Sequence, residues 1–472
     1  MSAPVLVLLC LFVVLLLGNV PIAVSLGLSA VVTIVAFKLA PLSFVAQSVL
    51  GAADSFTLLA IPLFVLAGSA LGRTALAADM IEFARKLTGR LPGGLGVVTV
   101  LVGIFLAGCS GSGPADVAAL GATLIPAMLT AGYRRGFACG IAASSGSIGI
   151  IIPPSIALVI YGVVSKASIS RLFIAGVFPG IIVGLSLIVV TMVMAGRSGG
   201  QAPDDRPSRQ EVLVAARRGF CALAVPVLLL VGVYFKLFPL VVAGGIGLAY
   251  TVLVHLLGFR AIWGLMAPVI ILGGIYGGVF TPTEAAGIVA AYALLVDLIV
   301  YRDLSWHDFV EILQDSGRTS AAVMIIVCGA SLFAWVLNTQ DAASAAGDAL
   351  LALAGTRVAA LLLVNLVLLI AGCLIDPISA YYILTPILLP VMTGFGVDPV
   401  HFGLIMTVNL AIAQITPPVG VNLFAACAVG KCSLGQIIRP IWLFVLAELG
   451  ALLVISFVPA TCLWLPDLLG VK

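Results

Sequence analysis

The sequence QITPPVGVNLF, residues 414–424, interrupts a long apolar segment near the C-terminal end of the chain. Its two adjacent prolines each remove a backbone hydrogen-bond donor and clash with the carbonyl group of the preceding helical turn. In lipid, unpaired backbone groups are tolerated only where the broken helix lines a cavity or meets a ligand. The freed carbonyl groups, with Thr and Asn side-chain oxygens beside them, suit a small hard cation such as Na⁺. We therefore expect a broken membrane helix with a cation bound at the break.

The composition supports a membrane setting for this break. Of the 472 residues, 62% are hydrophobic and only 9% are charged, and the mean hydropathy is +1.29. Soluble domains carry about 25% charged residues, so the chain is predicted to be an all-α polytopic membrane protein. A bilayer needs ~20 apolar residues per helix, which predicts about twelve spans. They lie near residues 4–19, 20–38, 57–72, 136–164, 172–195, 220–236, 238–258, 261–280, 285–301, 319–337, 400–428 and 437–459.

Two further apolar segments, residues 93–131 and 358–394, are interrupted by polar residues and are predicted to be re-entrant hairpins. With the N-terminus outside and both hairpins returning to their own side, most of the 22 Lys and Arg residues fall in cytoplasmic loops, as the positive-inside rule requires. The hydrophilic stretch 196–219 is predicted to be a cytoplasmic linker. Residues 73–90 are predicted to form an interfacial helix.

An internal repeat relates the two hairpins. At an offset of 264 residues, Gly108–Gly132 aligns without a gap over Gly372–Gly396, and Ile150–Ser155 falls on Gln414–Val419. An odd number of predicted spans separates the copies, so the second copy is inverted. Inverted repeats with broken helices are a known design of secondary transporters, which bind substrate and ions near the bilayer midplane. A simple proline kink is the alternative, but it requires neither the pairing nor the polar neighbours.

Several motifs together resemble the large membrane subunit of a tripartite ATP-independent periplasmic (TRAP) transporter. They are SGSGPADVAALG (110–121), IPAMLTAGYRRGFACGIAASSGSIGIIIPPS (125–155), GGIYGGVFTPTEAA (273–286), LTPILLP (384–390) and the segment 396–424. The resemblance covers nearly the whole chain. It implies an elevator-type transporter of the bacterial inner membrane that couples uptake of an organic anion, such as a C4-dicarboxylate or a sialic or other sugar acid, to more than one Na⁺. It also implies two partners, a small membrane subunit and a periplasmic substrate-binding protein.

The predicted organisation follows from the repeat and the resemblance. In chain order it comprises N-terminal scaffold spans with the interfacial helix (1–92), the first repeat core (93–195), the linker (196–219), an extra two-span insertion (220–258), second-half scaffold spans (259–357), and the second repeat core with the last span (358–472). The insertion departs from the family pattern. We expect it to pack on the static scaffold.

Site residues are transferred from the resemblance, position by position. One Na⁺ is expected between the first hairpin tip and the first break, near Ser110, Ser112, Ser147, Gly149 and Pro153. A second Na⁺ is expected near Asp376, Thr416, Gly420 and Asn422. The substrate is expected between the tips, where helix N-termini favour a carboxylate, near Gly111, Gly113, Ser155, Ser379 and Pro418.

Three acidic positions have structural interpretations as well. Asp376 lies inside an apolar stretch, where an acidic residue is interpreted as functional by default. The alternative is that Asp376 caps the hairpin. Asp116 is explained at least as well by capping or tertiary pairing as by ligand contact. Thr281 and Glu284 at a span end fit a helix N-cap with a first-turn acid.

Other classes of function have less support. GCSG at residues 108–111 matches rhomboid-type intramembrane serine proteases, with His255 as a candidate base, but the match is short and the repeat explains the segment better. The chain has no GxxxxGK[ST] motif for ATP hydrolysis, and His255, His307 and His401 suggest no metal site. Its thinly spread basic residues do not indicate a nucleic-acid partner. We predict a transporter rather than an enzyme. The remaining alternatives are a channel and a Na⁺/anion symporter that works without a binding protein.

Overall fold

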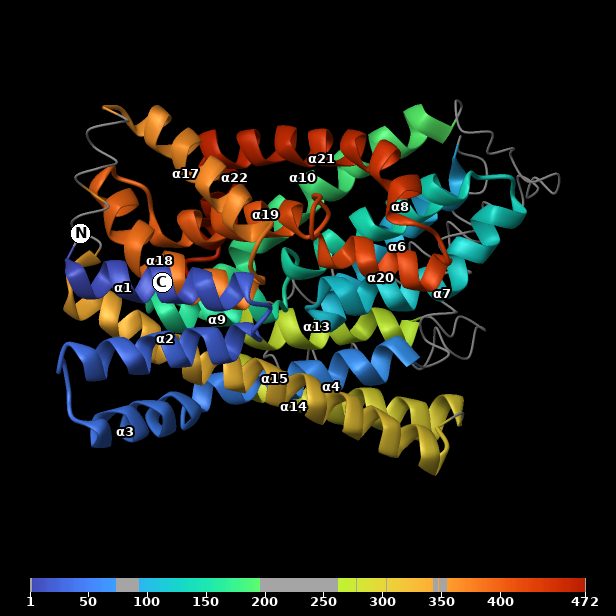
Figure 1. Ribbon diagram of the computed structural model, residues 1–472. Coiled ribbons are helices and arrows are strands. Elements are labelled where there is room, and N and C mark those ends of the chain that lie inside the picture. The colour runs from blue at the N-terminus through green and yellow to red at the C-terminus, as the bar shows by residue number, and fades with distance from the viewer. Residues whose placement is uncertain are drawn as a thin grey trace.

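The computed structural model describes residues 2–73, 93–195, 262–276, 278–302, 304–342, 347 and 355–471. Within these ranges the secondary structure is entirely helical, which confirms the predicted all-α class (Figure 1). The predicted interfacial helix 73–90, the linker 196–219 and the insertion 220–258 lie largely or wholly outside the described residues.

The short helices of the N-terminal part form one layer together with helices from the middle of the chain, residues 262–339. Its elements are α1 (Ala3–Leu17), α2 (Ile22–Ala36), α3 (Leu42–Ala53), the 3₁₀ turn η1 (Phe56–Leu59) and α4 (Ala60–Arg73). They pack against α14 (Pro282–Val296), which ends in the π-helical turn Asp297–Tyr301, and against the long α15 (Trp306–Thr339), and α13 (Ile262–Tyr276) packs on α14. Helices α2 and α15 touch through backbone, because a Cβ at Gly329 would lie 2.6 Å from the carbonyl oxygen of Ala23.

The remaining helices form two sets of five. The first set is α6 (Gly94–Ser110), α7 (Gly113–Thr130), α8 (Arg135–Ser147) with the 3₁₀ turn η2 (Ile148–Ile150), α9 (Ile156–Ser165) and α10 (Ile169–Ala195). The second set is α17 (Arg357–Gly372), α18 (Pro377–Gly394), α19 (Pro399–Ala413), α20 (Val421–Gly430) and α21 (Leu434–Phe457), followed by α22 (Ala460–Leu468). Helix α18 begins and ends 264 residues after α7, and the other pairs agree within two residues.

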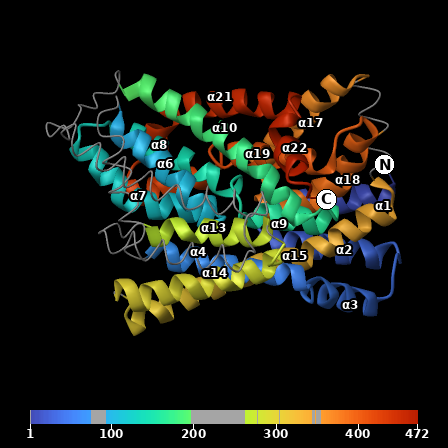
Figure 2. The ribbon, with the colours of Figure 1, turned by 180° about the vertical axis from the view of Figure 1, so that it is seen from behind.

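The two sets pack reciprocally, as both views of the ribbon allow the reader to follow (Figures 1 and 2). Helix α20 packs on α7, and its counterpart α9 packs on α18. In the same way α21 packs on α8, and α10 packs on α19. Each half of the core is therefore completed by a helix of the other half.

Ten of the twelve predicted spans fall largely in the described ranges, and fewer continuous long spans are found there. Six helices in the described ranges are long and apolar enough to cross a bilayer, or seven if the bent pair formed by α3 with η1 and α4 is one span. Helices α1 and α2 have 15 residues each, short of the ~20 that a perpendicular crossing needs. Hydropathy cannot separate a continuous span from a broken one, because both are equally apolar.

Helix starts follow local chemistry. Thr281 and Glu284 form a capping box at the start of α14, which confirms their predicted structural role. The start of α15 uses Ser305 and Asp308 in the same way. Inside the core, a buried ladder joins α17, α19 and α21. Asn409 Nδ2 donates to Asn365 Oδ1 at 2.8 Å, and Asn365 Nδ2 donates to Ser456 Oγ at 3.1 Å.

Candidate functional site

The tip of the first hairpin sits directly on the first helix break. Gly111 has a φ of +62°, and a Cβ there would lie 2.8 Å from the carbonyl oxygen of Pro154. A Cβ at Gly149 would lie 3.2 Å from the backbone nitrogen of Gly113 and 2.3 Å from Asp116 Oδ2. Only glycine permits both backbone approaches. The structure thus brings together the two segments from which the first predicted site was drawn.

Two of the predicted serines are organised by Asp116 in the first turn of α7. Ser110 Oγ donates to Asp116 Oδ1 at 2.5 Å, and the Ser112 backbone N–H donates to Ser110 Oγ at 3.2 Å. The Asp116 carboxyl is buried, and its Oδ2 has no hydrogen-bond partner among the described residues. The alternative of tertiary pairing is therefore what the structure shows. Asp116 also presents an acceptor oxygen to the break.

The third predicted serine pairs with an acid that the sequence reasoning missed. Ser147 Oγ lies 2.7 Å from the Ser144 carbonyl oxygen and 2.6 Å from Glu448 Oε1. Glu448 is fully buried on α21, and its Oε2 has no partner among the described residues. A signal was present, since Glu448 is the only acid between Asp398 and Asp467 and an intramembrane acid is functional by default.

The other residues of the first break have local roles. Ser155 is the N-cap of α9, where its hydroxyl accepts from the Leu158 N–H at 3.4 Å and donates to the Ile150 carbonyl oxygen at 2.6 Å. Pro153 is buried beside it. Both Pro-Pro bonds, Pro153–Pro154 and its repeat equivalent Pro417–Pro418, are cis.

Asn422, which the sequence analysis groups with the second Na⁺, has a side chain that faces the first half of the chain. Asn422 Nδ2 is directed at the Ala143 carbonyl oxygen at 3.4 Å. A Cβ at Gly113 would lie 3.0 Å from Asn422 Oδ1, 2.5 Å from Gln414 Oε1 and 2.8 Å from the Gly146 carbonyl oxygen. The cause is tertiary, since α20 packs on α7 and α8. The second break therefore meets the tip of the first hairpin.

The second hairpin is capped by its aspartate. Asp376 is the N-cap of α18, where Oδ1 accepts from the Ser379 N–H at 3.0 Å and Oδ2 accepts from Ser379 Oγ at 2.6 Å. Thr416 Oγ1 donates back to the Ile412 carbonyl oxygen at 2.7 Å, and Gly420 starts α20 with a φ of +51°. Pro418 is exposed. Within the described ranges no hydrogen bond joins Asp376 to Thr416 or Gly420, so the structure shows the capping alternative for Asp376.

The core thus holds a set of buried side-chain oxygens without hydrogen-bond partners in the described ranges. They are Asp116 Oδ2, Ser144 Oγ, Gln414 Oε1, Asn422 Oδ1 and Glu448 Oε2. Buried polar atoms are normally paired, and carboxylate, hydroxyl and amide oxygens are the ligands of hard cations. The donor set around the first hairpin tip therefore fits a small cation.

Comparison with known proteins places the chain in a family. The model of the DctM component of tripartite ATP-independent periplasmic transporters matches residues 9–261 and 257–461. The chain is 38% identical over 450 residues to the C4-dicarboxylate TRAP transporter large permease protein DctM of Pseudomonas aeruginosa, covering 95% of each chain. It is 33% identical over 454 residues to the sialic acid TRAP transporter large permease protein SiaM of Vibrio cholerae, covering 96% of each.

The chain belongs to the DctM family of TRAP transporter subunits. It is also 38% identical over 449 residues to the isethionate TRAP transporter permease protein DctMQ of Oleidesulfovibrio alaskensis, covering 95% of this chain but only 64% of that longer protein. The structure superposes on the Alcanivorax borkumensis YdaH transporter with a TM-score of 0.58, 14% identity and coverage of 96% and 98%. That likeness concerns the fold alone.

Membership in the DctM family confirms the family recognised from the motifs and the prediction of a multi-pass transporter rather than an enzyme. The protease alternative fails, because the relatives are permeases and Ser110 donates its hydroxyl to a carboxylate. His255, its candidate base, lies outside the described residues.

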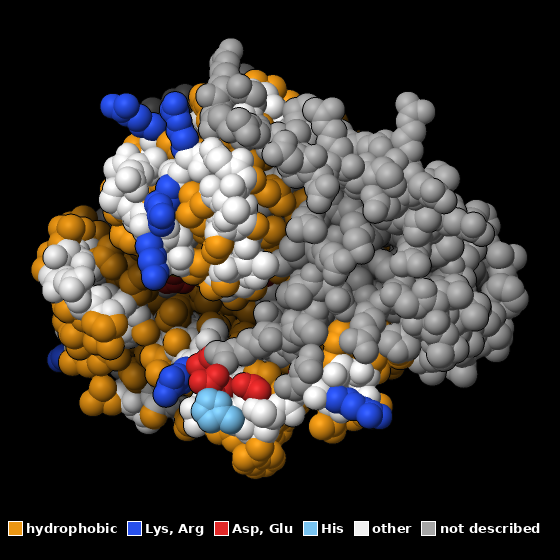
Figure 3. Space-filling view, turned by 90° about the vertical axis from the view of Figure 1, so that its right-hand side faces the viewer, with side chains coloured by type: hydrophobic (Ala, Val, Ile, Leu, Met, Phe, Trp, Pro, Cys, Tyr) orange, Lys and Arg blue, Asp and Glu red, His pale blue; other side chains and the backbone are white. Residues whose placement is uncertain are grey.

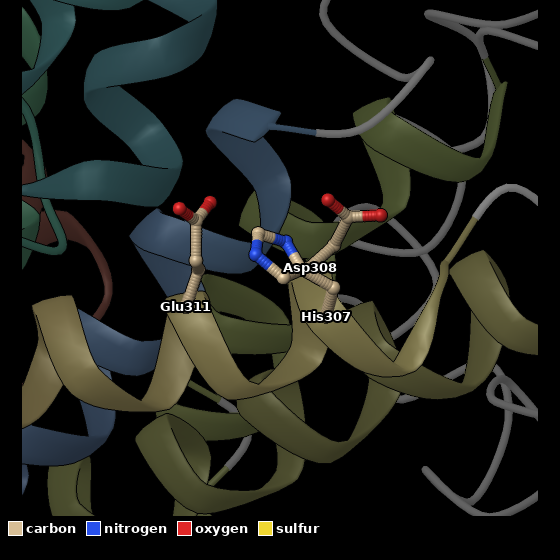
Figure 4. Close-up of side chains that lie close together, drawn as sticks. All are labelled: His307, Asp308 and Glu311. Carbon is tan, nitrogen blue, oxygen red and sulfur yellow. The ribbon is translucent and has the colours of Figure 1, made fainter.

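Among the described residues, one other cluster of possible metal ligands lies away from the core. The side chains of His307, Asp308 and Glu311 come within 4.8 Å of one another on the first turns of α15 (Figure 4). Helical spacing explains their proximity, and Asp308 already closes the capping box with Ser305. His401 lies elsewhere, buried on α19 with Nε2 2.8 Å from the Ile455 carbonyl oxygen. We assign no metal site to these residues.

Proposed function

We propose that this chain is the membrane permease of a TRAP system that imports an organic acid anion and couples its uptake to Na⁺. Relatives named for C4-dicarboxylates, sialic acid and 2,3-diketo-L-gulonate support the substrate class. All three compounds carry carboxylates. The substrate would be delivered by a periplasmic binding protein, and a small membrane subunit would assemble with this chain in the bacterial inner membrane.

The observation that carries the Na⁺ proposal is the group of partnerless oxygens at the first hairpin tip. Asp116 Oδ2, Gln414 Oε1 and Asn422 Oδ1 are buried and approach the backbone of Gly113 or Gly149. The ionised form of an intramembrane acid without a basic partner is stabilised by a bound cation. Na⁺ satisfies it and takes oxygen ligands. We propose that Ser110, Ser112 and Gly149 complete this site, as the family resemblance implies.

Ser147 and Pro153 are retained in the proposal as residues that shape the first break. A second Na⁺ at the second break would use Thr416, Gly420 and the lone pairs of Asp376 that the cap leaves free. The proposal moves Asn422 from that site to the first one, because its side chain faces Gly113 and Ala143.

The substrate is proposed to bind where helix N-termini converge near the midplane. Helix α7 begins at Gly113, α9 begins after its cap Ser155, and α18 begins beside Ser379. Each N-terminus carries unpaired N–H groups and about half a positive charge. A carboxylate is the ligand that such ends favour. Gly111 and Pro418 would border the site without contributing side-chain charge.

The mechanism is proposed to be of the elevator type. The reciprocal packing of α7 with α20 and of α18 with α9 supports an inverted repeat. Broken helices at the repeat interface are the transporter arrangement in which one bundle moves against a static one. Helices α1–α4 and α13–α15 would be the static part, and the two hairpins with the broken helices would move.

The deciding experiment is uptake into proteoliposomes that contain this chain and its small subunit. Labelled C4-dicarboxylate and sialic acid are each supplied with the cognate binding protein, with and without an inward Na⁺ gradient. Uptake that requires both the binding protein and the gradient supports the proposal. Uptake that proceeds without the binding protein would favour the independent symporter, and uptake insensitive to Na⁺ would reject the coupling.

A further inference from the structure

A basic cavity lies at the end of the protein where α8 and α21 begin and α10 ends. Its volume is about 660 Å³. It is lined by Arg134, Arg135, Gly136, Phe137, Met194, Gly435, Gln436, Arg439 and Pro440. The three arginines are exposed. The predicted orientation puts this end at the cytoplasmic side of the membrane.

Local packing brings the arginines together. A Cβ at Gly136 would lie 2.1 Å from the carbonyl oxygen of Gln436, so only a glycine lets the first turn of α8 approach α21 this closely. That approach sets Arg135 and Arg439 at the same cavity. Arg135 Nη1 also donates to the Gly430 carbonyl oxygen at 2.7 Å, which fixes its guanidinium and leaves its other N–H groups available.

The positive charge at this cavity has no acidic counterpart nearby in the sequence. No Asp or Glu occurs from residue 117 to 203 or from 399 to 447, the stretches that supply all of its lining residues. Figure 3, which looks at the end where α7, α8 and α20 lie, shows a row of Lys and Arg side chains at the upper left of the face and a few more lower down, near Asp, Glu and His side chains. An anion is therefore the expected ligand, and arginine clusters match the geometry of phosphate through paired N–H donors.

The surface that leads away from the cavity is apolar. On α10, Leu185, Val189 and Val193 recur every four residues and are 55%, 59% and 61% exposed. On α21, which packs beside α10, the exposed residues Trp442, Leu443 and Leu446 begin one turn after Arg439. Tryptophan is the residue that membrane proteins place at the headgroup level. Positive charge at the cavity next to an apolar stripe fits an anionic lipid. The headgroup would lie in the cavity, and the acyl chains would lie along α10 and α21.

We propose that Arg134, Arg135 and Arg439 bind the phosphate of an anionic phospholipid from the cytoplasmic leaflet, with its acyl chains lying on α10 and α21. Basic cavities between membrane helices on the cytoplasmic side are known to take such headgroups. A free phosphate shares the chemistry of the headgroup but has no acyl chains to cover the apolar stripe.

The test compares phosphatidylglycerol with phosphatidylcholine by native mass spectrometry of the purified full chain in detergent. The variant is Arg134→Gln with Arg439→Gln, which leaves Arg135 in its contact with Gly430. A matched control, Lys166→Gln with Arg357→Gln, removes two exposed charges from the opposite predicted side. Each basic residue near a headgroup contributes about 1 kcal/mol. The variant should therefore bind phosphatidylglycerol about thirtyfold more weakly, and the control should bind it like the wild type.

Two further arms identify the source of the phosphate and guard against misfolding. Glycerol phosphate and inorganic phosphate are added as competitors, and displacement of the lipid by either at low concentration would overturn the lipid assignment. Photoactivatable phosphatidylglycerol is cross-linked to the wild-type chain, which needs no variant. Cross-links in peptides that contain residues 134–140 or 435–446 support the site. Cross-links spread evenly over the chain, or equal binding by variant and wild type, would overturn it.

Discussion

Replacing Gly149 with alanine tests the contact between the first hairpin tip and the first break. The new methyl group would lie 2.3 Å from Asp116 Oδ2 and 3.2 Å from both Gly113 N and Ser112 C. Carbon and oxygen atoms are seldom closer than about 3.3 Å even in a weak C–H···O contact. The carboxylate must therefore move by about 1 Å. The methyl group itself has little room to move away, because the backbone of the tip lies only 3.2 Å from it.

That movement would separate Asp116 from Ser110, whose hydroxyl now donates to it at 2.5 Å. Overpacking of this size costs about 1–3 kcal/mol. If the cost falls on the geometry that binds Na⁺, affinity drops by roughly tenfold for each 1.4 kcal/mol. We expect Gly149→Ala to weaken Na⁺ binding by about tenfold or more, because the ligands of a binding site must be held within about 0.5 Å.

The assay is the rise in thermal unfolding temperature with Na⁺ concentration, since a ligand that binds only the native state stabilises it according to its dissociation constant. Gly317→Ala on α15 is the matched control, because a Cβ there meets nothing within 4 Å. It should raise stability by about 0.5–1 kcal/mol without changing Na⁺ affinity. A folded Gly149→Ala protein that binds Na⁺ as tightly as the wild type would refute the proposed contact between tip, break and ion.

Five further substitutions, arranged in four tests, probe other parts of the protein. Asp116→Asn keeps the side-chain volume but removes the charge. Na⁺-dependent uptake should fall about tenfold or more, because a hydrogen bond or contact to a charged group contributes about 1.5–3 kcal/mol. Unchanged uptake would exclude the carboxylate from ion binding. Asn365→Ala should lower the free energy of unfolding by about 1–3 kcal/mol, because it removes the hydrogen bond to Ser456 Oγ and one of the two hydrogen bonds of Asn409 Nδ2, which keeps its bond to the Ile405 carbonyl oxygen; thermal unfolding in detergent measures it. Thr281→Val removes the N-cap of α14 and should cost about 0.5–2 kcal/mol with uptake per folded protein preserved, and a selective loss of uptake would show a role beyond capping. In a double-mutant cycle of unfolding free energies, Ser147→Ala and Glu448→Gln should show an interaction energy of about 0.5–3 kcal/mol. Strict additivity would mean that the 2.6 Å contact between Ser147 and Glu448 does not contribute to stability.

Local features of this chain were readable from residue types. The glycines and prolines at the two hairpin tips and the two breaks mark places where helices stop, whereas Pro126, Pro386 and Pro390 lie inside α7 and α18. Thr281 and Glu284 could be recognised as a capping box because such a motif needs only four consecutive residues. The offset of 264 residues found in the sequence also relates the bounds of α7 to those of α18.

Long-range relations were not readable in this way. Asn422 was placed with its own hairpin because sequence proximity was the only guide, whereas its side chain faces Gly113 in the other half of the chain. Glu448 was missed as a partner of Ser147 because some 300 residues separate them. The predicted Asp376 ligand is an N-cap, and local sequence cannot decide between a capping carboxylate and one that also holds an ion.

The amino-acid sequence alone determined three things: that the chain is a membrane protein, at which residues its helices break, and to which transporter family it belongs. These properties depend on composition and on short-range backbone chemistry, which involve only residues close together in the sequence. The tertiary structure alone decided which oxygens face one another across the core. That choice depends on how α20 packs on α7 and α21 on α8, and a side chain on a helix acquires its partners only when another helix is laid against it.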